Sequence, residues 1–301
     1  MAGGKSGKTL APALHYNRNP DPSMLRRDVP AASPELDYAA LSDTGLLREQ
    51  NEDSIAVSAE YGLMVLADGM GGYSAGEVAS GIAVAVIRRT VESRLRRRWH
   101  RLPRGGAMPH LLGGAVELAN SAILSAARQQ PEYAGMGTTV VAALFHHDQI
   151  SIAHAGDSRA YRLRDGIVAQ LTRDHSLLQA QLDAGLISAE AARTSEHKNL
   201  VTRAVGIDPA LEVEVHQHRI AVGDLYLLCS DGLSDLLTGP ELAELLAAAG
   251  TDLQQAAAAL VQRANDHGGR DNISVILARV RSTPTAPARA GLLGRLSGWR
   301  R

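Results

Sequence analysis

The chain contains 301 residues with a formal net charge of −1, and 45% of its residues are hydrophobic although only 3% are aromatic. This length supports one large domain or two small ones. The balanced charge argues against a nucleic-acid partner. The chain has no apolar run of roughly 18 residues, which argues against a membrane-spanning helix. The single cysteine, Cys229, excludes a disulfide framework, and the first residues lack a signal peptide's apolar stretch, so we expect a monomer in the reducing cytoplasm.

Two proline-containing end segments flank a central region. Residues 1–34 contain five prolines and few large apolar side chains, which predicts a flexible arm. Residues 282–301 combine two prolines with a basic end, which predicts a flexible tail. The intervening residues 35–281 show no linker and no repeat, and are predicted to form one domain.

The first predicted elements of this domain are a strand and two helices. Residues 61–67 form an apolar strand pattern. Residues 75–91 place Val78, Ile82 and Val86 on one helical face, and residues 112–128 repeat that pattern.

Strands dominate the middle of the chain. Apolar, β-branched runs predict strands at residues 138–145, 150–155, 160–163 and 167–171. The turns between them are so short that each neighbouring pair is expected to be antiparallel. Two further strands are predicted at 224–229 and 273–280. Near the C-terminus, Pro240 indicates one helix start, and Thr251 is the expected N-cap of a helix over residues 252–266.

The order of these elements predicts the fold class. Helix pairs separated by runs of antiparallel strands indicate segregated layers and not an alternating parallel sheet. Several strands are apolar on both faces, as expected for a sheet that is covered by another sheet and by helices. We predict an α+β fold, a four-layer α-β-β-α sandwich with two central antiparallel sheets flanked by helix pairs.

Four aspartates stand at the predicted strand ends, in four separate segments: Asp68, Asp157, Asp231 and Asp271. The first three of them adjoin a glycine. Each one alone is most simply a solvated turn residue. As a set, they would repel one another unless a cation held them together. Because these segments offer only oxygen ligands, Mg²⁺ or Mn²⁺ is favoured over zinc. Arg48, Glu52 and Asp53 add an anion-binding group and two more carboxylates, which together indicate phosphate-ester hydrolysis.

The motifs, taken in order, resemble the protein phosphatase 2C family of metal-dependent serine/threonine phosphatases, over about residues 38–280. The form Asp-Gly-Met-Gly-Gly resembles the bacterial branch of that family. The resemblance rests on these segments: Ser42-Asp43-Thr44-Gly45, Arg48, Asn51-Glu52-Asp53, Ala67-Asp68-Gly69-Met70-Gly71-Gly72, Gly137-Thr138-Thr139, Ala155-Gly156-Asp157-Ser158-Arg159, Ser230-Asp231-Gly232 and Asp271-Asn272.

This resemblance implies a metal site of two core ions and a third, weaker one. It implies that Asp68 bridges the two core ions and that the carbonyl of Gly69 also binds metal. It further implies that Asp231 and Asp271 complete the first ion's site. Glu52 and Asp53 would hold waters of the second ion, directly or through hydrogen bonds. Asp157, together with Asp231, would bind the third ion.

The resemblance also implies a mechanism. Two ions about 3.5–4 Å apart lower the pKa of a bridging water, and the resulting hydroxide attacks phosphorus directly. Arg48 would grip the substrate phosphate with its fork of donors. No covalent nucleophile is needed, and Cys229 is interpreted as a small buried strand residue.

The activity expected from this resemblance is hydrolysis of phosphoserine and phosphothreonine, opposing a bacterial Ser/Thr kinase and acting on its targets. Two alternatives remain: a catalytically silent member that binds phosphoproteins, and a phosphatase that acts on anti-sigma-factor antagonists.

One departure concerns the proton for the leaving group. Some eukaryotic members of the family have a histidine, assigned as general acid, where this chain has Met70. The proton must then come from a metal-bound water or from another residue. His175 is a candidate, although a structural histidine that closes a turn is the preferred interpretation. Residues 175–206 correspond to the family's flap, with a short helix expected near residue 182, and are hypothesised to help select substrates.

Three other segments invite a function. Residues 2–9 resemble a P-loop but lack the preceding strand that a P-loop requires, so a flexible arm is the preferred interpretation. The arginine-rich residues 88–104 form either a solvated helix end or a docking patch for an acidic partner. Residues 292–301 contain leucines, Trp299 and arginines, yet are short for membrane anchoring.

Overall fold

The computed structural model describes residues 33–72, 75–98, 106–188, 191, 200–248 and 250–284. All of these belong to one compact unit, Ala31–Arg301. The P-loop-like segment at residues 2–9, the segment 292–301 and nearly all of the predicted arm and tail therefore lie outside the described residues.

Two antiparallel sheets form the centre of this unit. We call the first sheet A; its strands, in spatial order, are β1 (Glu35–Asp43), β11 (Ile273–Ser282), β10 (Leu225–Cys229), β7 (Arg159–Arg164) and β8 (Ile167–Gln170). We call the second sheet B; its strands are β2 (Asp53–Ser58), β3 (Leu63–Met70), β5 (Val140–His146), β6 (Gln149–Ala155) and β9 (Glu214–Arg219), with the short β4 (Gly137–Thr138) paired to β3.

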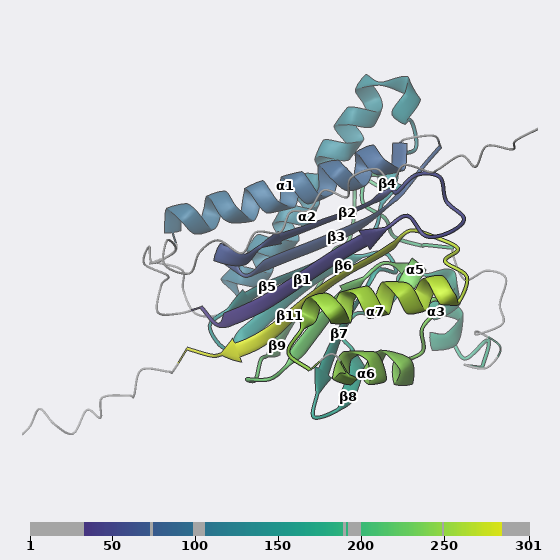
Figure 1. The fold of residues 1–301 in the computed structure, drawn as a ribbon. Coiled ribbons are helices and arrows are strands. Elements are labelled where there is room, and N and C mark those ends of the chain that lie inside the picture. The colour runs from purple at the N-terminus through teal and green to yellow at the C-terminus, as the bar shows by residue number, and fades with distance from the viewer. Residues whose placement is uncertain are drawn as a thin grey trace, which may run out of the picture. The chain divides into compact units, whose positions relative to one another are not determined.

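Helices cover the outer face of each sheet (Figure 1). The long helices α1 (Ala75–Arg98) and α2 (Ala107–Gln129) pack on sheet B. Sheet A is covered by α5 (Asp231–Ser234), α6 (Gly239–Ala248) and α7 (Leu253–Asp266). Among the described residues, the remaining elements are α3 (Leu177–Asp183) and the 3₁₀ turns η1 (Ala59–Tyr61) and η3 (Pro131–Tyr133). No helix in the described ranges combines the length and apolar character needed to cross a membrane.

Three apolar clusters fill the spaces between these layers. β3 shows how the sequence produces them: Leu63, Val65 and Ala67 pack with α1 and α2 in one cluster. Met64 and Leu66 point to the opposite face and pack between the two sheets. A third cluster lies between sheet A and α7. Successive strand residues face opposite sides, so a strand with cores on both sides must be apolar throughout. The predicted four-layer α-β-β-α sandwich is confirmed.

One predicted connection is wrong. The short turn at residues 156–158 was expected to join two antiparallel neighbours, but β6 belongs to sheet B and β7 to sheet A. Gly156, at φ +114°, allows the chain to change sheets here, and an added Cβ would lie 2.6 Å from the Cβ of Thr139. The two hairpins β5–β6 and β7–β8 do pair as predicted. Asp157 consequently lies where the chain crosses between the layers.

The other differences concern element boundaries. Asp252, and not Thr251, caps α7, because its carboxylate accepts from the backbone N–H groups of Gln254 and Gln255. The flap helix α3 begins earlier than expected, at Leu177, where the Ser176 side chain caps it. The strands β1, β2 and β9 were not predicted. Strands β1 and β9 carry polar residues at many positions, and β2 is only half buried after Asp53.

Candidate metal centre and phosphate site

The carboxylates of Asp53 and Asp68 are brought together by the pairing of β2 with β3, in which these two residues are direct partners. The backbone of Asp68 is held by Thr138, the last residue of β4, and by Thr139, which follows it. Its N–H donates to Thr139 Oγ1 (3.1 Å), and its carbonyl accepts from Thr138 Oγ1 (2.8 Å) and from the N–H of Thr139 (2.8 Å). The motif Gly137-Thr138-Thr139 thus fixes the position of Asp68.

Sheet A supplies the facing pair, Asp231 and Asp271. Asp231 is the first residue of α5, two residues after the end of β10, and Asp271 lies two residues before β11. The backbone of the two segments is in close contact, since a Cβ added to Gly232 would lie 2.0 Å from the carbonyl oxygen of Asn272. Only glycine fits at position 232, which explains the Asp-Gly pattern after this strand.

Asn272 ties the Arg48–Asp53 segment to sheet A. Its amide donates to the carbonyls of Thr44 (3.0 Å) and Gln50 (2.9 Å), and its Oδ1 accepts from the N–H of Glu52 (2.8 Å). Gly45, at φ +76°, approaches so closely that an added Cβ would lie 2.2 Å from the Asp271 carbonyl oxygen. One amide side chain therefore fixes the backbone of this segment at Gln50 and Glu52.

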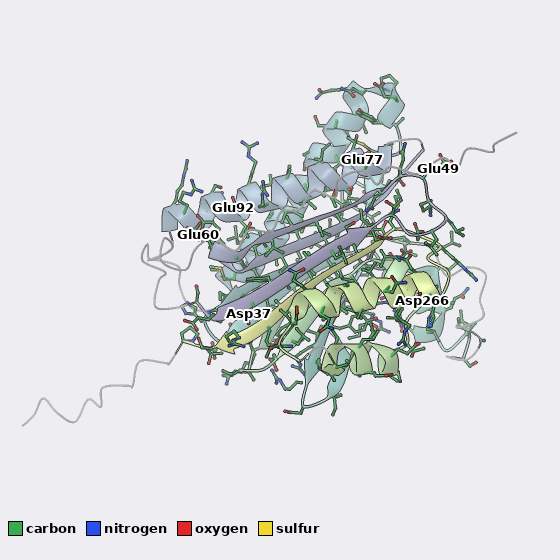
Figure 2. The ribbon with its side chains drawn as sticks, viewed as in Figure 1. Asp37, Glu49, Glu60, Glu77, Glu92 and Asp266 are labelled. Atoms are coloured by element: carbon green, nitrogen blue, oxygen red, sulfur yellow. The ribbon has the colours of Figure 1, made fainter. Side chains whose placement is uncertain are left out.

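Glu52 itself lies against the first turn of α1. A Cβ on Gly76 would come within 2.8 Å of its carboxyl carbon, and a Cβ on Gly69 would lie 2.1 Å from the Gly76 carbonyl oxygen. Burial raises the pKa of Glu52 above its ordinary value, although the nearby Arg48 opposes this. Glu77 also raises that pKa, and Figure 2 shows it near Glu49 at this end of the molecule, whereas Glu60 and Glu92 lie at the other end of α1.

Charge repulsion dominates the centre. Burial raises the pKa of Asp68 well above its ordinary value, and the charges of Asp53, Asp231 and Asp157 raise it further. Burial, followed by the charge of Asp157, raises the pKa of Asp231 to about 8. Burial also raises the pKa of Asp53 to about 6, even though Ser230 donates a hydrogen bond to its Oδ2 at 2.9 Å. Such a group of buried acids is strongly destabilised when all members are ionised.

Two buried oxygens in this centre have no hydrogen-bond partner: Oδ1 of Asp53 and Oδ1 of Asp231. Buried polar atoms are normally paired, so an unpaired carboxylate oxygen inside a cluster of like charges needs an external cation. The donor set contains carboxylate and backbone oxygens only. These residues therefore fit the hard divalent ions Mg²⁺ and Mn²⁺.

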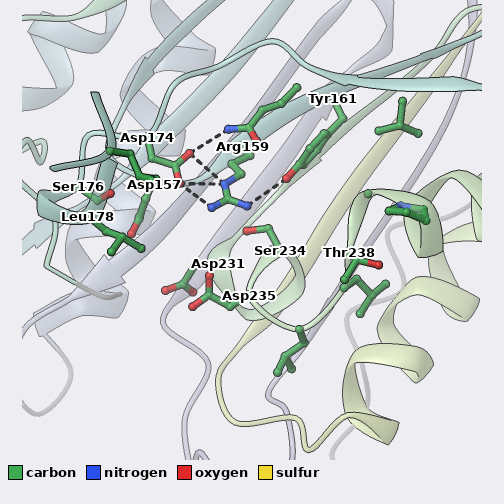
Figure 3. Close-up of a pocket in the computed structure, with 17 residues that line it drawn as sticks. Asp157, Arg159, Tyr161, Asp174, Ser176, Leu178, Asp231, Ser234, Asp235 and Thr238 are labelled. Atoms are coloured by element: carbon green, nitrogen blue, oxygen red, sulfur yellow. Dashed lines mark hydrogen bonds and ion pairs between the residues drawn. The ribbon is translucent and has the colours of Figure 1, made fainter. Parts of the chain in front are cut away.

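Asp157 approaches the centre from the link between the sheets. Burial, followed by the charge of Asp174, raises its pKa to about 6. Asp235, which the sequence interpretation missed, raises the pKa of both Asp157 and Asp231. Figure 3 shows Asp235 beside Asp231, with Asp157 facing them. The signal was present in the spacing, because residues four apart in a helical turn share a face.

Arg48 lies at the rim of the centre. Its Nη2 donates to Asp271 Oδ2 at 2.7 Å, and half of its side chain (52%) remains exposed. The guanidinium is therefore accessible to an incoming anion while one carboxylate holds it in place. All eight predicted residues thus lie in one neighbourhood at this end of the sandwich: Arg48, Glu52, Asp53, Asp68, Gly69, Asp157, Asp231 and Asp271.

His175 is held as a structural residue would be. Its Nε2 lies 3.0 Å from Glu214 Oε2, and its Nδ1 accepts from the N–H of Gly156 at 3.3 Å. Its ring stacks on His154 at 4.6 Å, and the side chain is 7% exposed. Both ring nitrogens are engaged away from the aspartates of the metal centre, which favours the structural interpretation over a general acid.

His154, His175 and Glu214 offer ligand atoms within 4.8 Å of one another, as a metal site would require. Their hydrogen bonds argue against one. Since Nδ1 of His175 accepts from Gly156, the ring proton lies on Nε2 and is donated to Glu214. Glu214 also contacts Nε2 of His216 at 2.6 Å. The lone pairs of His175 and Glu214 that a metal would need are therefore already used. Of the three side chains, only His154 keeps an unpaired buried nitrogen, Nδ1, so the three-ligand set is not available and we assign no ion here.

The arginine-rich segment is described in part. Arg88, Arg89, Arg94 and Arg97 are exposed on α1, and Arg96 Nε donates to Tyr61 Oη at 3.4 Å. Residues 99–105 lie outside the described part of the chain. A docking role for this segment stays a prediction.

Comparison with known proteins gives consistent matches. The family model for protein phosphatase 2C matches residues 48–278. The chain is 37% identical to serine/threonine protein phosphatase PstP of Mycobacterium tuberculosis over 266 residues, covering 87% of this chain and 48% of that protein. It thus spans about half the length of that relative. It is 36% identical to serine/threonine phosphatase stp of Listeria monocytogenes, covering 78% of this chain and 92% of that one.

Solved structures agree. The crystal structure of PstP/Ppp from M. tuberculosis superposes with a TM-score of 0.74 at 38% identity, over 82% of this chain and 99% of that chain. The catalytic domain of PstP in complex with two manganese ions superposes with a TM-score of 0.72 at 38% identity, over 83% of this chain and 100% of that chain.

Proposed function

The chain belongs to the protein phosphatase 2C family, and from this membership we propose that it is a metal-dependent phosphatase that hydrolyses phosphoserine and phosphothreonine in proteins. The observation that carries the proposal is the buried set of carboxylates drawn from both sheets. Burial and mutual repulsion raise the pKa values of Asp68 and Asp231, and two of the carboxylate oxygens lack any partner. Arg48 at the rim adds the anion-binding group that a phosphate substrate needs.

We assign the roles of the acidic residues as follows. Asp68 and the carbonyl of Gly69 would hold the two core ions, Mn²⁺ or Mg²⁺, and Asp231 and Asp271 would complete the ligands of the first ion. Glu52 and Asp53 would hold the second ion, directly or through water. Asp157 and Asp231, with Asp235 nearby, hold a third and weaker ion. The unpaired oxygens of Asp53 and Asp231 support this assignment. When bound, such ions lower the pKa of a coordinated water until it can attack phosphorus directly near neutral pH.

The protein's own groups orient the substrate. Arg48 presents parallel N–H donors to two phosphate oxygens and neutralises charge that develops as the leaving oxygen departs. Its contact with Asp271 keeps the guanidinium at the rim before substrate arrives. Met70, at the end of β3, has no proton to give, and both ring nitrogens of His175 are engaged elsewhere. The leaving oxygen therefore takes its proton from water in the open site.

The test is hydrolysis of a phosphothreonine peptide with Mn²⁺, with EDTA, and by Asp231→Asn. We expect Mn²⁺-dependent release of phosphate that EDTA abolishes and that Asp231→Asn reduces by more than about 100-fold, since loss of an outer-shell partner alone typically costs 10–100-fold. Asp266→Asn, on the exposed end of α7 (Figure 2), is the matched control and should retain full activity. Activity that persists in EDTA would refute the metal mechanism.

The cellular role proposed here is reversal of phosphorylation by a bacterial Ser/Thr kinase, with the kinase and its targets as cytoplasmic partners. Two curated relatives are named serine/threonine phosphatases, which supports the substrate class. A silent phosphoprotein-binding role finds less support, because every expected acidic residue and Arg48 are present.

A further inference from the structure

A groove of about 660 Å³ opens from the metal centre. Asp157 and Asp231 line one end of it, and the rest runs between the flap helix α3 and the segment that connects α5 to α6 (Figure 3). Ligand pockets in proteins typically occupy about 300–1,000 Å³. The groove therefore has room for considerably more than a phosphate group.

One wall of the groove is an apolar helix face that the rest of the described structure covers only in part. Leu178 and Leu182 lie four residues apart in α3, on the same face, and both line the groove. No residue of α3 is buried, and neither leucine belongs to the three apolar clusters of the fold. The opposite wall presents Leu236 and Pro240 to the same space.

The charges of the groove are gathered at its metal end. Arg159 donates from Nε to Asp174 (2.9 Å), from Nη2 to the same carboxylate (2.6 Å) and from Nη1 to Tyr161 Oη (3.2 Å). This guanidinium is neutralised and fixed, so it is not a second phosphate-binding group. The remaining carboxylates, Asp157, Asp231 and Asp235, lie beside the centre.

The groove thus offers a charged end for the phosphorylated residue and aliphatic walls beyond it. We propose that it binds the substrate segment that flanks the phosphorylated residue and that it selects an aliphatic side chain there. This inference rests on the proposed function. Its occupant is an extended phosphoprotein segment, because the groove is continuous with the centre that receives the phosphate.

Matched phosphothreonine peptides test this selection in the unmodified protein. Each pair differs only in one flanking position, which is leucine in one peptide and asparagine, of similar size, in the other. The position is placed one or two residues before or after the phosphothreonine. We expect kcat/KM to favour leucine by about tenfold or more at one of these positions, the range that filling a hydrophobic pocket supplies. Equal values at every position would overturn the inference.

Substitutions locate the effect. Leu178→Gln and Leu182→Gln should each bring the leucine-to-asparagine ratio of kcat/KM towards one. Leu186→Gln, at a leucine of the same flap that is 74% exposed and does not line the groove, should leave the ratio unchanged. A ratio that survives both groove substitutions would contradict the assignment.

Failure of this inference is distinguishable from failure of the proposed function. A small aryl phosphate has no flanking residues, so its Mn²⁺-dependent hydrolysis reports only on the centre. If the protein hydrolyses the aryl phosphate but does not discriminate between the leucine and asparagine peptides, only the inference about the groove is refuted. Absence of hydrolysis of all substrates refutes both.

Discussion

Two clusters of buried ionisable groups lie towards opposite edges of sheet B, and they balance their charges in opposite ways. At the β2–β3 edge, Asp53 and Asp68 repel one another and the aspartates from sheet A. At the β6–β9 edge, Glu214 accepts hydrogen bonds from His175 and His216 beside the stacked ring of His154. The first cluster carries an excess of negative charge, whereas in the second cluster the histidines hydrogen-bond to the carboxylate and compensate its charge.

This difference teaches which buried polar cluster is a site. Burial alone does not decide, since both clusters are largely removed from water. Although burial opposes ionisation, the hydrogen bonds from His175 and His216 hold the pKa of Glu214 below its ordinary value. In the acidic cluster the pKa values are raised, and Arg48, which pairs with Asp271, leaves the carboxylates of Asp53, Asp68 and Asp231 without a neutralising partner. A cluster that cannot neutralise itself needs a ligand.

The strongest test of the comparison is Asp68→Asn. We expect phosphatase activity with Mn²⁺ to fall by more than about 100-fold, because a bridging ligand is lost. The same substitution removes repulsion, so the metal-free protein should become more stable, by on the order of 2 kcal/mol. Urea unfolding in EDTA measures this gain. A loss of stability in the metal-free state would contradict the proposed repulsion.

The second test is the pH dependence of stability without metal. The folded-state pKa of Asp231 is about 8 and that of Asp53 about 6, both above the ordinary 3.8. The folded protein therefore binds more protons than the unfolded chain between about pH 4 and pH 8, and its stability should fall as pH rises through that window. Melting temperatures in EDTA and in Mn²⁺ should diverge with rising pH. Parallel curves would show that no cation is needed.

The third test concerns the self-compensated cluster. Glu214→Gln removes the charged acceptor of His175 and should destabilise the protein by about 1–3 kcal/mol. Because the pKa of Glu214 is lowered, its contribution is present above the pKa of the unfolded chain and is lost as pH falls. The exposed Glu117→Gln in α2 is the matched control and should have little effect. Denaturant unfolding measures the free energy of unfolding of both variants relative to the unmodified protein.

The smallest effect is expected from two glycines of α1. Gly76→Ala would push against the Glu52 carboxylate, and we expect Mn²⁺ affinity to fall by about tenfold, in the range of outer-shell changes. Gly81→Ala meets nothing within 4 Å and should stabilise the helix by up to about 1 kcal/mol. Calorimetric titration with Mn²⁺ separates the two. If Gly76→Ala binds Mn²⁺ as tightly as the unmodified protein, Glu52 is not positioned by its contact with Gly76.

Local patterns in the sequence predicted much of the fold. The apolar runs at β3, β5, β6 and β10 appear where the residue types indicated, and their two-sided apolar character predicted the stacked sheets. Strands whose residues are largely polar or only half buried, such as β9, gave no comparable signal. The chain's change of sheet at Gly156 was also not predictable, because a short turn between two strands looks the same in sequence whether or not the strands pair.

The sequence by itself determined the identities of the candidate site residues, since their order and their glycine neighbours match one family. Only the tertiary structure decided how they are held. Asn272 bonds to Glu52 across 220 positions, and Arg48 reaches Asp271 across 223. No periodicity reports contacts at such separations. The histidine cluster and the groove beside α3 likewise became visible only in three dimensions, because each is assembled from elements that are distant along the chain.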